Sequence, residues 1–78
     1  MGLATDFGRN LRRVRRAKGI TLEALAHDVG LAYSYLGQLE RGLRNPTLNV
    51  VENIASILQV SAISLLSPAP DSDTTGPV

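Results

Sequence analysis

The side chains able to carry out chemistry in this sequence are few and poorly suited to catalysis. The 78 residues include no cysteine and a single histidine, His27, so a thiolate nucleophile, a disulfide framework and a thiolate metal site are excluded. The seven acidic residues form no pair at a spacing useful for general acid–base work. A histidine without ligand partners is far more often a surface side chain than a metal ligand. The sequence therefore predicts no enzyme, no cofactor and no metal site.

The basic residues are concentrated in one part of the chain. Six of the eight lie within residues 9–18. Without Asp71 and Asp73 near the C-terminus, the formal net charge of +1 becomes +3. This distribution suits a nucleic-acid partner. A solvated basic helix face would explain the cluster as well, so the charge pattern alone does not choose between them.

The next stretch predicts two short helices joined by a tight turn. The first helix has apolar residues at i, i+3, i+4 and i+7, namely Leu22, Leu25, Ala26 and Val29. Gly30 permits the positive φ of a sharp turn, and Leu31 then points inward. The second helix buries Leu36 and Leu39 and ends at Gly42. Its outward residues are Tyr33, Ser34, Gly37, Gln38 and Arg41. Two helices, a turn containing glycine and an outward polar face form the pattern of a helix-turn-helix.

Three further amphipathic segments predict the helices that support this unit, over about residues 6–18, 48–58 and 62–66. The expected caps are Thr5 or Asp6, Thr21, Thr47 and Ser61. The expected inward residues of the two longer segments are Phe7, Leu11, Val14, Leu48, Val51, Ile54, Ala55 and Leu58. Residues 1–5 look like a frayed lead-in, and no stretch alternates as a strand would. The predicted fold class is therefore all-α, with five helices in one small domain over residues 1–66.

Arg15 falls beside the apolar stripe of the first helix, where a cation needs a partner. An unpaired buried charge is very costly, so a carboxylate must lie nearby. Glu40, on the inward side of the third helix, is the best candidate. We expect an Arg15–Glu40 ion pair between the two helices; the alternative is that both side chains are exposed to solvent.

The last twelve residues, SPAPDSDTTGPV, differ in composition from the rest of the chain. They contain too little apolar surface to offset the entropy of ordering, so residues 67–78 are predicted to be a disordered tail. A domain this small is marginally stable alone, and a partner subunit is a reasonable expectation. Ile63, Leu65 and Leu66 on the last helix are the predicted dimer interface. Closure of the core within one chain is the alternative for these three side chains.

Residues 7–66 resemble the Cro/repressor, or Xre-type, family of helix-turn-helix proteins. The stretches that carry the resemblance are LEALAHDVGLAYSYLGQLERG, RNPTL and IASILQVS. The segment SYLGQLERGLRNPTL looks especially like the small controller proteins of bacterial restriction–modification systems. The resemblance implies a five-helix, phage-repressor-like domain that acts as a homodimer on a (pseudo)palindromic operator in double-stranded DNA. The third helix would lie in the major groove, with half-sites about 34 Å apart.

The resemblance also implies roles for individual residues. The positions at which the family reads bases are Tyr33, Ser34 and Gln38. Controller proteins place a further DNA-contacting tyrosine where this chain has Tyr35, for which packing in the core is the alternative. The positions that grip phosphate are Arg44 and Asn45, with Arg41 as a helper. Arg15 and Glu40 match the family's internal ion pair, in agreement with the packing argument. The chemistry is consistent, since glutamine can bind adenine through two hydrogen bonds and arginine binds phosphate without reading sequence.

Three positions depart from the family pattern. Leu22 stands where a phosphate-binding glutamine is common, and Ala32 stands where a serine or threonine usually caps the third helix. Gly37 lies in mid-helix, where it destabilises the helix by ~1 kcal/mol relative to alanine. We therefore expect few direct contacts to bases and a contribution from DNA shape.

The sequence favours a self-regulating transcriptional regulator, with a second functional class kept open. The alternative is an antitoxin-type protein-interaction module that also binds DNA. No apolar run reaches the roughly 20 residues that span a bilayer, and no apolar h-region follows Met1, so we expect neither a membrane span nor a signal peptide. The expected location is the cytoplasm, with no membrane and no small-molecule substrate as partner.

Overall fold

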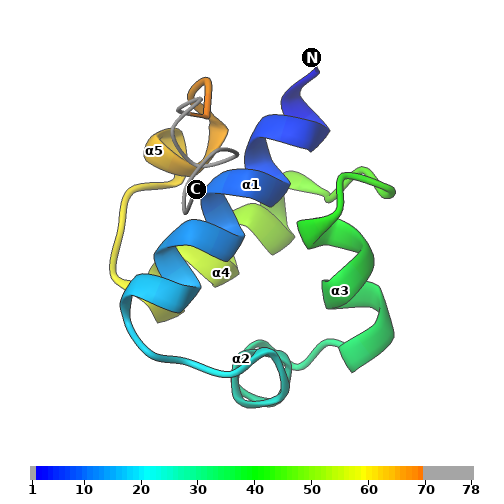
Figure 1. Ribbon diagram of the computed structural model, residues 1–78, viewed down its shortest axis with the longest axis vertical. Helices are drawn as coiled ribbons and strands as arrows, with labels where there is room; N and C mark the ends of the chain where they lie inside the picture. The colour runs from blue at the N-terminus through cyan, green and yellow to red at the C-terminus, as the bar shows by residue number, and fades with distance from the viewer. Residues whose placement is uncertain (1, 70–78) are drawn as a thin grey trace, which may run out of the picture.

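The computed structural model describes residues 2–69 of the chain, which form five helices and no strand. The helices are α1 (Leu3–Ala17), α2 (Leu22–Val29), α3 (Tyr33–Glu40), α4 (Leu48–Leu58) and α5 (Ala62–Leu66). Figure 1 shows α1 between α5 on one side and α3 on the other, and α1 contacts both. The α2 helix contacts α3 and α4, and α4 also contacts α5. The predicted all-α, five-helix fold is confirmed.

The helix-turn-helix of α2 and α3 forms as its local sequence indicates. The Thr21 hydroxyl accepts a hydrogen bond from the Ala24 amide at 3.0 Å and so caps α2. Gly30 ends the helix with φ at 73°, and the Leu31 amide donates to the Ala26 carbonyl at 2.9 Å. Thr47 and Ser61 cap α4 and α5 in the same way.

The first helix begins earlier than predicted. It starts at Leu3 rather than after Thr5 or Asp6, its N-cap is Gly2, and the Asp6 amide donates to the Gly2 carbonyl at 3.1 Å. Thr5 and Asp6 offer side-chain caps, but leucine and alanine at positions 3 and 4 are good helix formers that extend the helix without one. Asp6 then lies in the first turn, where a negative charge is favourable.

The core draws on all five helices, and its most buried large side chains are Phe7, Leu11, Leu25, Leu36, Leu39, Ile54, Leu58 and Leu65. Two predictions about burial are wrong. Leu48, expected inside, is 75% exposed because it is the first residue of α4 and projects past the end of the core. Leu65, expected at a dimer interface, is 0% exposed because it completes the core of its own chain.

Glycine at position 8 is required by the way α1 packs on the end of α3. A Cβ atom at Gly8 would lie 2.4 Å from the Leu39 carbonyl oxygen and 2.7 Å from the Glu40 carbonyl oxygen. Both contacts are with backbone, which cannot move aside as a flexible side chain can. The last turn of α3 therefore lies directly against α1.

A buried polar residue that the sequence did not indicate joins α1 to the C-terminal end of the domain. Asn10 is fully buried, and its amide Nδ2 donates to the carbonyls of Leu65 at 2.9 Å and Ser67 at 2.7 Å. Its Oδ1 accepts from Arg13 at 2.7 Å, so both ends of the amide are paired.

The predicted tail begins at residue 67, but residues 67–69 are described and two of them contact the domain. Besides the Ser67 contact to Asn10, the Ala69 amide donates to Asp6 Oδ1 at 3.3 Å. The rest of the predicted tail, residues 70–78, lies outside the described residues.

We predict that Asn10→Ala lowers the free energy of unfolding by about 1–3 kcal/mol, because two carbonyls lose their buried donor. The matched control is Asn53→Ala, which removes an exposed amide from α4 and should change stability by less than about 0.5 kcal/mol. Urea unfolding followed by circular dichroism measures both. Equal stability of the two variants would contradict a structural role for Asn10.

Candidate nucleic-acid interface

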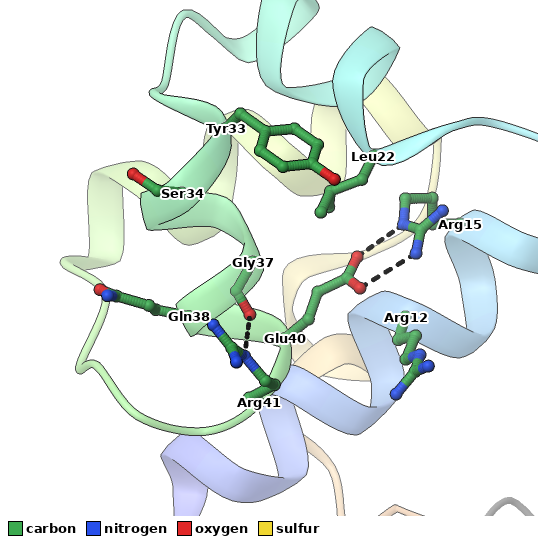
Figure 2. A pocket seen from close by; sticks show the side chains of 9 residues that line it. All are labelled: Arg12, Arg15, Leu22, Tyr33, Ser34, Gly37, Gln38, Glu40 and Arg41. Carbon is green, nitrogen blue, oxygen red and sulfur yellow. Dashed lines mark hydrogen bonds and ion pairs between the residues drawn. The ribbon is translucent and has the colours of Figure 1, made fainter.

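The outward face of α3 carries the side chains predicted to read bases. Tyr33 is 56% exposed, Ser34 is exposed and Gln38 is partly exposed. Figure 2 shows Ser34 and Gln38 pointing out from α3 on the same side, while Tyr33 extends across toward Leu22 at the start of α2. The structure therefore brings these three residues onto one surface, with Tyr33 turned away from the other two.

The orientation of α3 is set by an ion pair with α1. Arg15 Nε lies 2.6 Å from Glu40 Oε2, and a second nitrogen of the same guanidinium lies 3.0 Å from Oε1. The third guanidinium nitrogen donates to the Ile20 carbonyl at 2.8 Å. Arg15 thus joins the end of α3 and the α1–α2 connection to α1, as the sequence argument expected for the two charged residues.

The electrostatics of this pair favour the charged form of the arginine. The hydrogen bonds that Arg15 donates to Glu40 raise the pKa of Arg15, and burial opposes this shift. A pKa raised on folding stabilises the protein at every pH below the unfolded value, and this is lost only as pH rises through the folded value. The arginine therefore stays charged, and adds no pH dependence to stability, anywhere near neutral pH.

Tyr35 and Arg44 form a contact that neither residue's position in the sequence revealed. The Arg44 guanidinium carbon lies 5.4 Å from the centroid of the Tyr35 ring, within the range of a cation–π interaction. Tyr35 is half-buried against the core, whereas Arg44 is exposed in the loop after α3. The Arg44 guanidinium thus packs against the Tyr35 ring on its protein side and is open to solvent on the other.

The remaining predicted phosphate-binding residues, Arg41 and Asn45, are exposed near the end of α3. Arg41 Nε donates weakly to the Gly37 carbonyl at 3.4 Å, which holds its side chain along α3. The turn after α3 uses Gly42, with φ at 74°, and the Leu43 amide donates to the Gln38 carbonyl at 3.0 Å.

A hollow of about 420 Å³ lies where α1, α2 and α3 meet (Figure 2). Its lining residues are Arg12, Arg15, Leu22, Tyr33, Ser34, Gly37, Gln38, Glu40 and Arg41. Arg12 was not among the predicted DNA-binding residues, which lie only on α3 and the loop that follows. Helical phase alone did not show that this side of α1 borders the start of α3.

The positions that depart from the family pattern have visible consequences. Ala32 has no side-chain oxygen, so the first amides of α3 have no side-chain acceptor at the N-cap. Leu22 is half-buried against the core and lines the hollow beside Gly37.

Two other kinds of site are missing from residues 2–69. No three histidine, cysteine or acidic side chains gather there in a way that would hold a metal ion. None of the helices in the same stretch combines the length and apolar character needed to traverse a bilayer.

We predict that Glu40→Gln lowers the free energy of unfolding by roughly 3 kcal/mol, because it leaves the largely buried Arg15 guanidinium without a counter-charge. The loss should be the same at about pH 6 and about pH 9, since the arginine stays charged across that range. The control Glu52→Gln, on the exposed side of α4, should change stability by less than about 0.5 kcal/mol. Denaturant unfolding measures the loss of stability as a shift of the midpoint, provided that the dependence of the unfolding free energy on denaturant concentration is unchanged. A loss no larger than that of the control would show that the pair is not structural.

Comparison with known proteins agrees with this arrangement. The family model described as helix-turn-helix matches residues 11–65. The uncharacterized HTH-type transcriptional regulator YazB of Bacillus subtilis is 39% identical over 65 residues, which cover 83% of this chain and 94% of YazB.

Two solved structures are also similar. The restriction–modification controller protein C.AhdI from Aeromonas hydrophila is 40% identical, with a TM-score of 0.76, over 80% of this chain and 94% of that chain. A structure of SinR, the master regulator for biofilm formation, in complex with DNA is 37% identical with a TM-score of 0.74. That match covers 78% of this chain and 98% of the SinR chain. With the family model, the relatives and the fold in agreement, the chain belongs to the helix-turn-helix family of DNA-binding transcriptional regulators, which are not enzymes.

Proposed function

We propose that the chain acts as a homodimer that binds a pseudo-palindromic operator, with α3 in the major groove of each half-site. The observation that carries this proposal is the placement of α3. Its polar outward face stands clear of the core, while Glu40 at its end is tied to Arg15 of α1. Two-fold related copies of such a helix would read half-sites about 34 Å apart.

The side chains on this surface have distinct chemical roles in the proposal. Gln38 binds an adenine edge through two hydrogen bonds, and Ser34 donates to a base edge or a phosphate. Tyr33, with its ring turned toward Leu22, meets the DNA at the edge of the half-site. Arg44, supported by the Tyr35 ring, provides a phosphate contact that does not depend on sequence.

The phosphate contacts continue along the loop after α3. Arg41 and Asn45 are exposed at and after the end of α3, and in this proposal each provides a further phosphate contact. Tyr35 then acts mainly through Arg44, because its ring is half-buried.

The likeness to C.AhdI supports a narrower proposal, that the operator lies upstream of the chain's own gene. That structure is of a restriction–modification controller protein, and the match covers nearly all of it. A chain that binds its own promoter would then be regulated by its own concentration.

The proposed dimer uses the exposed apolar surface at α5. Ile63 is 78% exposed, and the neighbouring Leu66 is half-buried. Ile57 near the end of α4 is also exposed, and α4 contacts α5. Ile63 and Leu66 are the part of the predicted interface that remains once Leu65 is assigned to the core, and Ile57 extends it.

A gel shift with the DNA upstream of the gene, at about 150 mM salt and with excess unrelated DNA, tests operator binding. We expect Gln38→Ala to lose about 1–3 kcal/mol of discrimination, and Arg44→Ala to weaken binding to all sequences alike. Asn53→Ala and Arg16→Ala, which remove an exposed amide and an exposed arginine elsewhere, should bind nearly as wild type. If the wild type binds DNA only as a salt-sensitive background, the operator proposal fails and a protein partner becomes the better explanation.

The dimer is tested by sedimentation of Ile63→Glu. Placing a charge at the interface should shift the chain to monomer and weaken operator binding by at least about tenfold, since dimer binding is then lost. The matched control is Leu48→Glu, because Leu48 is similarly exposed but lies at the start of α4. Dissociation caused by Leu48→Glu and not by Ile63→Glu would place the interface elsewhere.

A further inference from the structure

Gly37 is a glycine that the fold itself does not require. Among residues 2–69 the positive-φ glycines are Gly19, Gly30 and Gly42, so Gly37 has ordinary helical backbone. A Cβ atom there would meet only the Leu22 side chain, at an ordinary contact distance of 3.6 Å. Glycine in mid-helix destabilises the helix relative to alanine. The chain thus carries a cost at this position that internal packing does not explain.

The space left by Gly37 belongs to the hollow between α1, α2 and α3. Arg12 of α1 and Arg41 at the end of α3 also line this space. Figure 2 shows Arg41 folded back to the Gly37 carbonyl, and Arg12 on the other side of Glu40. Both arginines are exposed to solvent. A group entering here would therefore lie against bare helix backbone, with a cation on each side.

The charge of the lining is positive. It contains three arginines and one glutamate, and the glutamate is already paired with Arg15. Neither Arg12 nor Arg41 forms an ion pair with any carboxylate in the described part of the chain. Two cationic side chains are thus available to an anion, and planar guanidinium groups suit phosphate oxygens well.

We propose that this hollow seats one phosphate of the DNA backbone, held by Arg12 and Arg41, and that position 37 is glycine so that the phosphate can approach α3. This inference rests on the proposed DNA-binding function and adds α1 to the surface that grips DNA. DNA is the source favoured over a free phosphate because the hollow also includes Tyr33, Ser34 and Gln38. A strand whose bases face these residues would pass over it.

The first test compares the salt dependence of operator affinity in wild type and two arginine variants. Each phosphate contact contributes about −0.9 to the slope of log K against log salt. We expect Arg12→Ala to reduce the magnitude of the slope by about one per bound chain. The control Arg16→Ala removes the same charge one turn further along α1, outside the hollow, and should leave the slope near that of wild type.

The second test uses Gly37 itself. Gly37→Gln should raise the melting temperature by a few degrees, because glutamine is a better helix former, and yet weaken operator binding by about tenfold or more. Gly37→Ala should stabilise the chain as well, with a smaller loss of binding. A variant that is more stable but binds the operator more weakly shows that Gly37 serves DNA binding. If Gly37 served only the fold, melting temperature and operator affinity would change in the same direction.

The third test identifies the phosphate. Single methylphosphonate linkages, scanned across the operator, remove one backbone charge at a time. One position should weaken binding of wild type and have no further effect on Arg12→Ala.

The inference is overturned if the operator is bound specifically while Arg12→Ala and Arg16→Ala share one slope, or if Gly37→Gln binds as wild type. It is also overturned by a second pair of results taken together. In that case no methylphosphonate position shows coupling to Arg12, while inorganic phosphate at matched ionic strength competes with DNA for binding to wild type but not to Arg12→Ala. The operator proposal survives each of these results, and it fails separately if wild type shows no specific binding.

Discussion

The bidentate contact between Arg15 and Glu40 is the constraint on which the surface of this domain depends. It joins the last turn of α1 to the last turn of α3, and the same guanidinium also holds the Ile20 carbonyl before α2. A planar guanidinium meeting a carboxylate through two hydrogen bonds fixes orientation as well as distance. Because Gly8 lets α1 approach the backbone of Leu39 and Glu40 closely, the charged pair and the steric contact act on the same end of the helix.

Anchoring α3 at one end allows the rest of the helix to be poorly stabilised. Its N-cap is Ala32, which makes no side-chain hydrogen bond, and Gly37 weakens its middle. An eight-residue helix with these features would not persist alone in water. Packing of Leu36 and Leu39 in the core, together with the pair at Glu40, therefore holds α3 in place. The outward side chains can then be selected for what they contact outside the molecule rather than for helix stability.

The sequence predicted best those features that depend on local chemistry. Thr21 and Gly30 fix the ends of α2 through a cap and a positive φ, and both can be read from residue type. The contact of Arg15 with Glu40 could be predicted because a cation beside an apolar stripe has few alternatives. The start of α1 was missed because Gly2 caps it through its backbone, which leaves no side-chain signal.

Features that depend on how distant segments meet could not be read in the same way. Asn10 looks like a surface residue until the carbonyls of Leu65 and Ser67 are placed beside it. Leu48 fits the apolar period of α4, but periodicity does not show that the buried part of the helix begins one turn later, at Val51. The support of Arg44 by Tyr35 and the approach of Arg12 to α3 likewise arise only in three dimensions.

The arrangement also explains why the net charge of +1 says little about this chain. Of the arginines on α1, Arg15 is neutralised by Glu40, and Arg13 is held by the buried Asn10. What matters for an anionic partner is where the exposed cations lie. Arg12 and Arg41 line the hollow, and Arg44 rests on its tyrosine. If each DNA-bound chain uses only a few such contacts, binding depends on salt less steeply than in a domain that covers its surface with lysine. Discrimination between sequences then rests on a small number of side chains and on the shape of the DNA they meet.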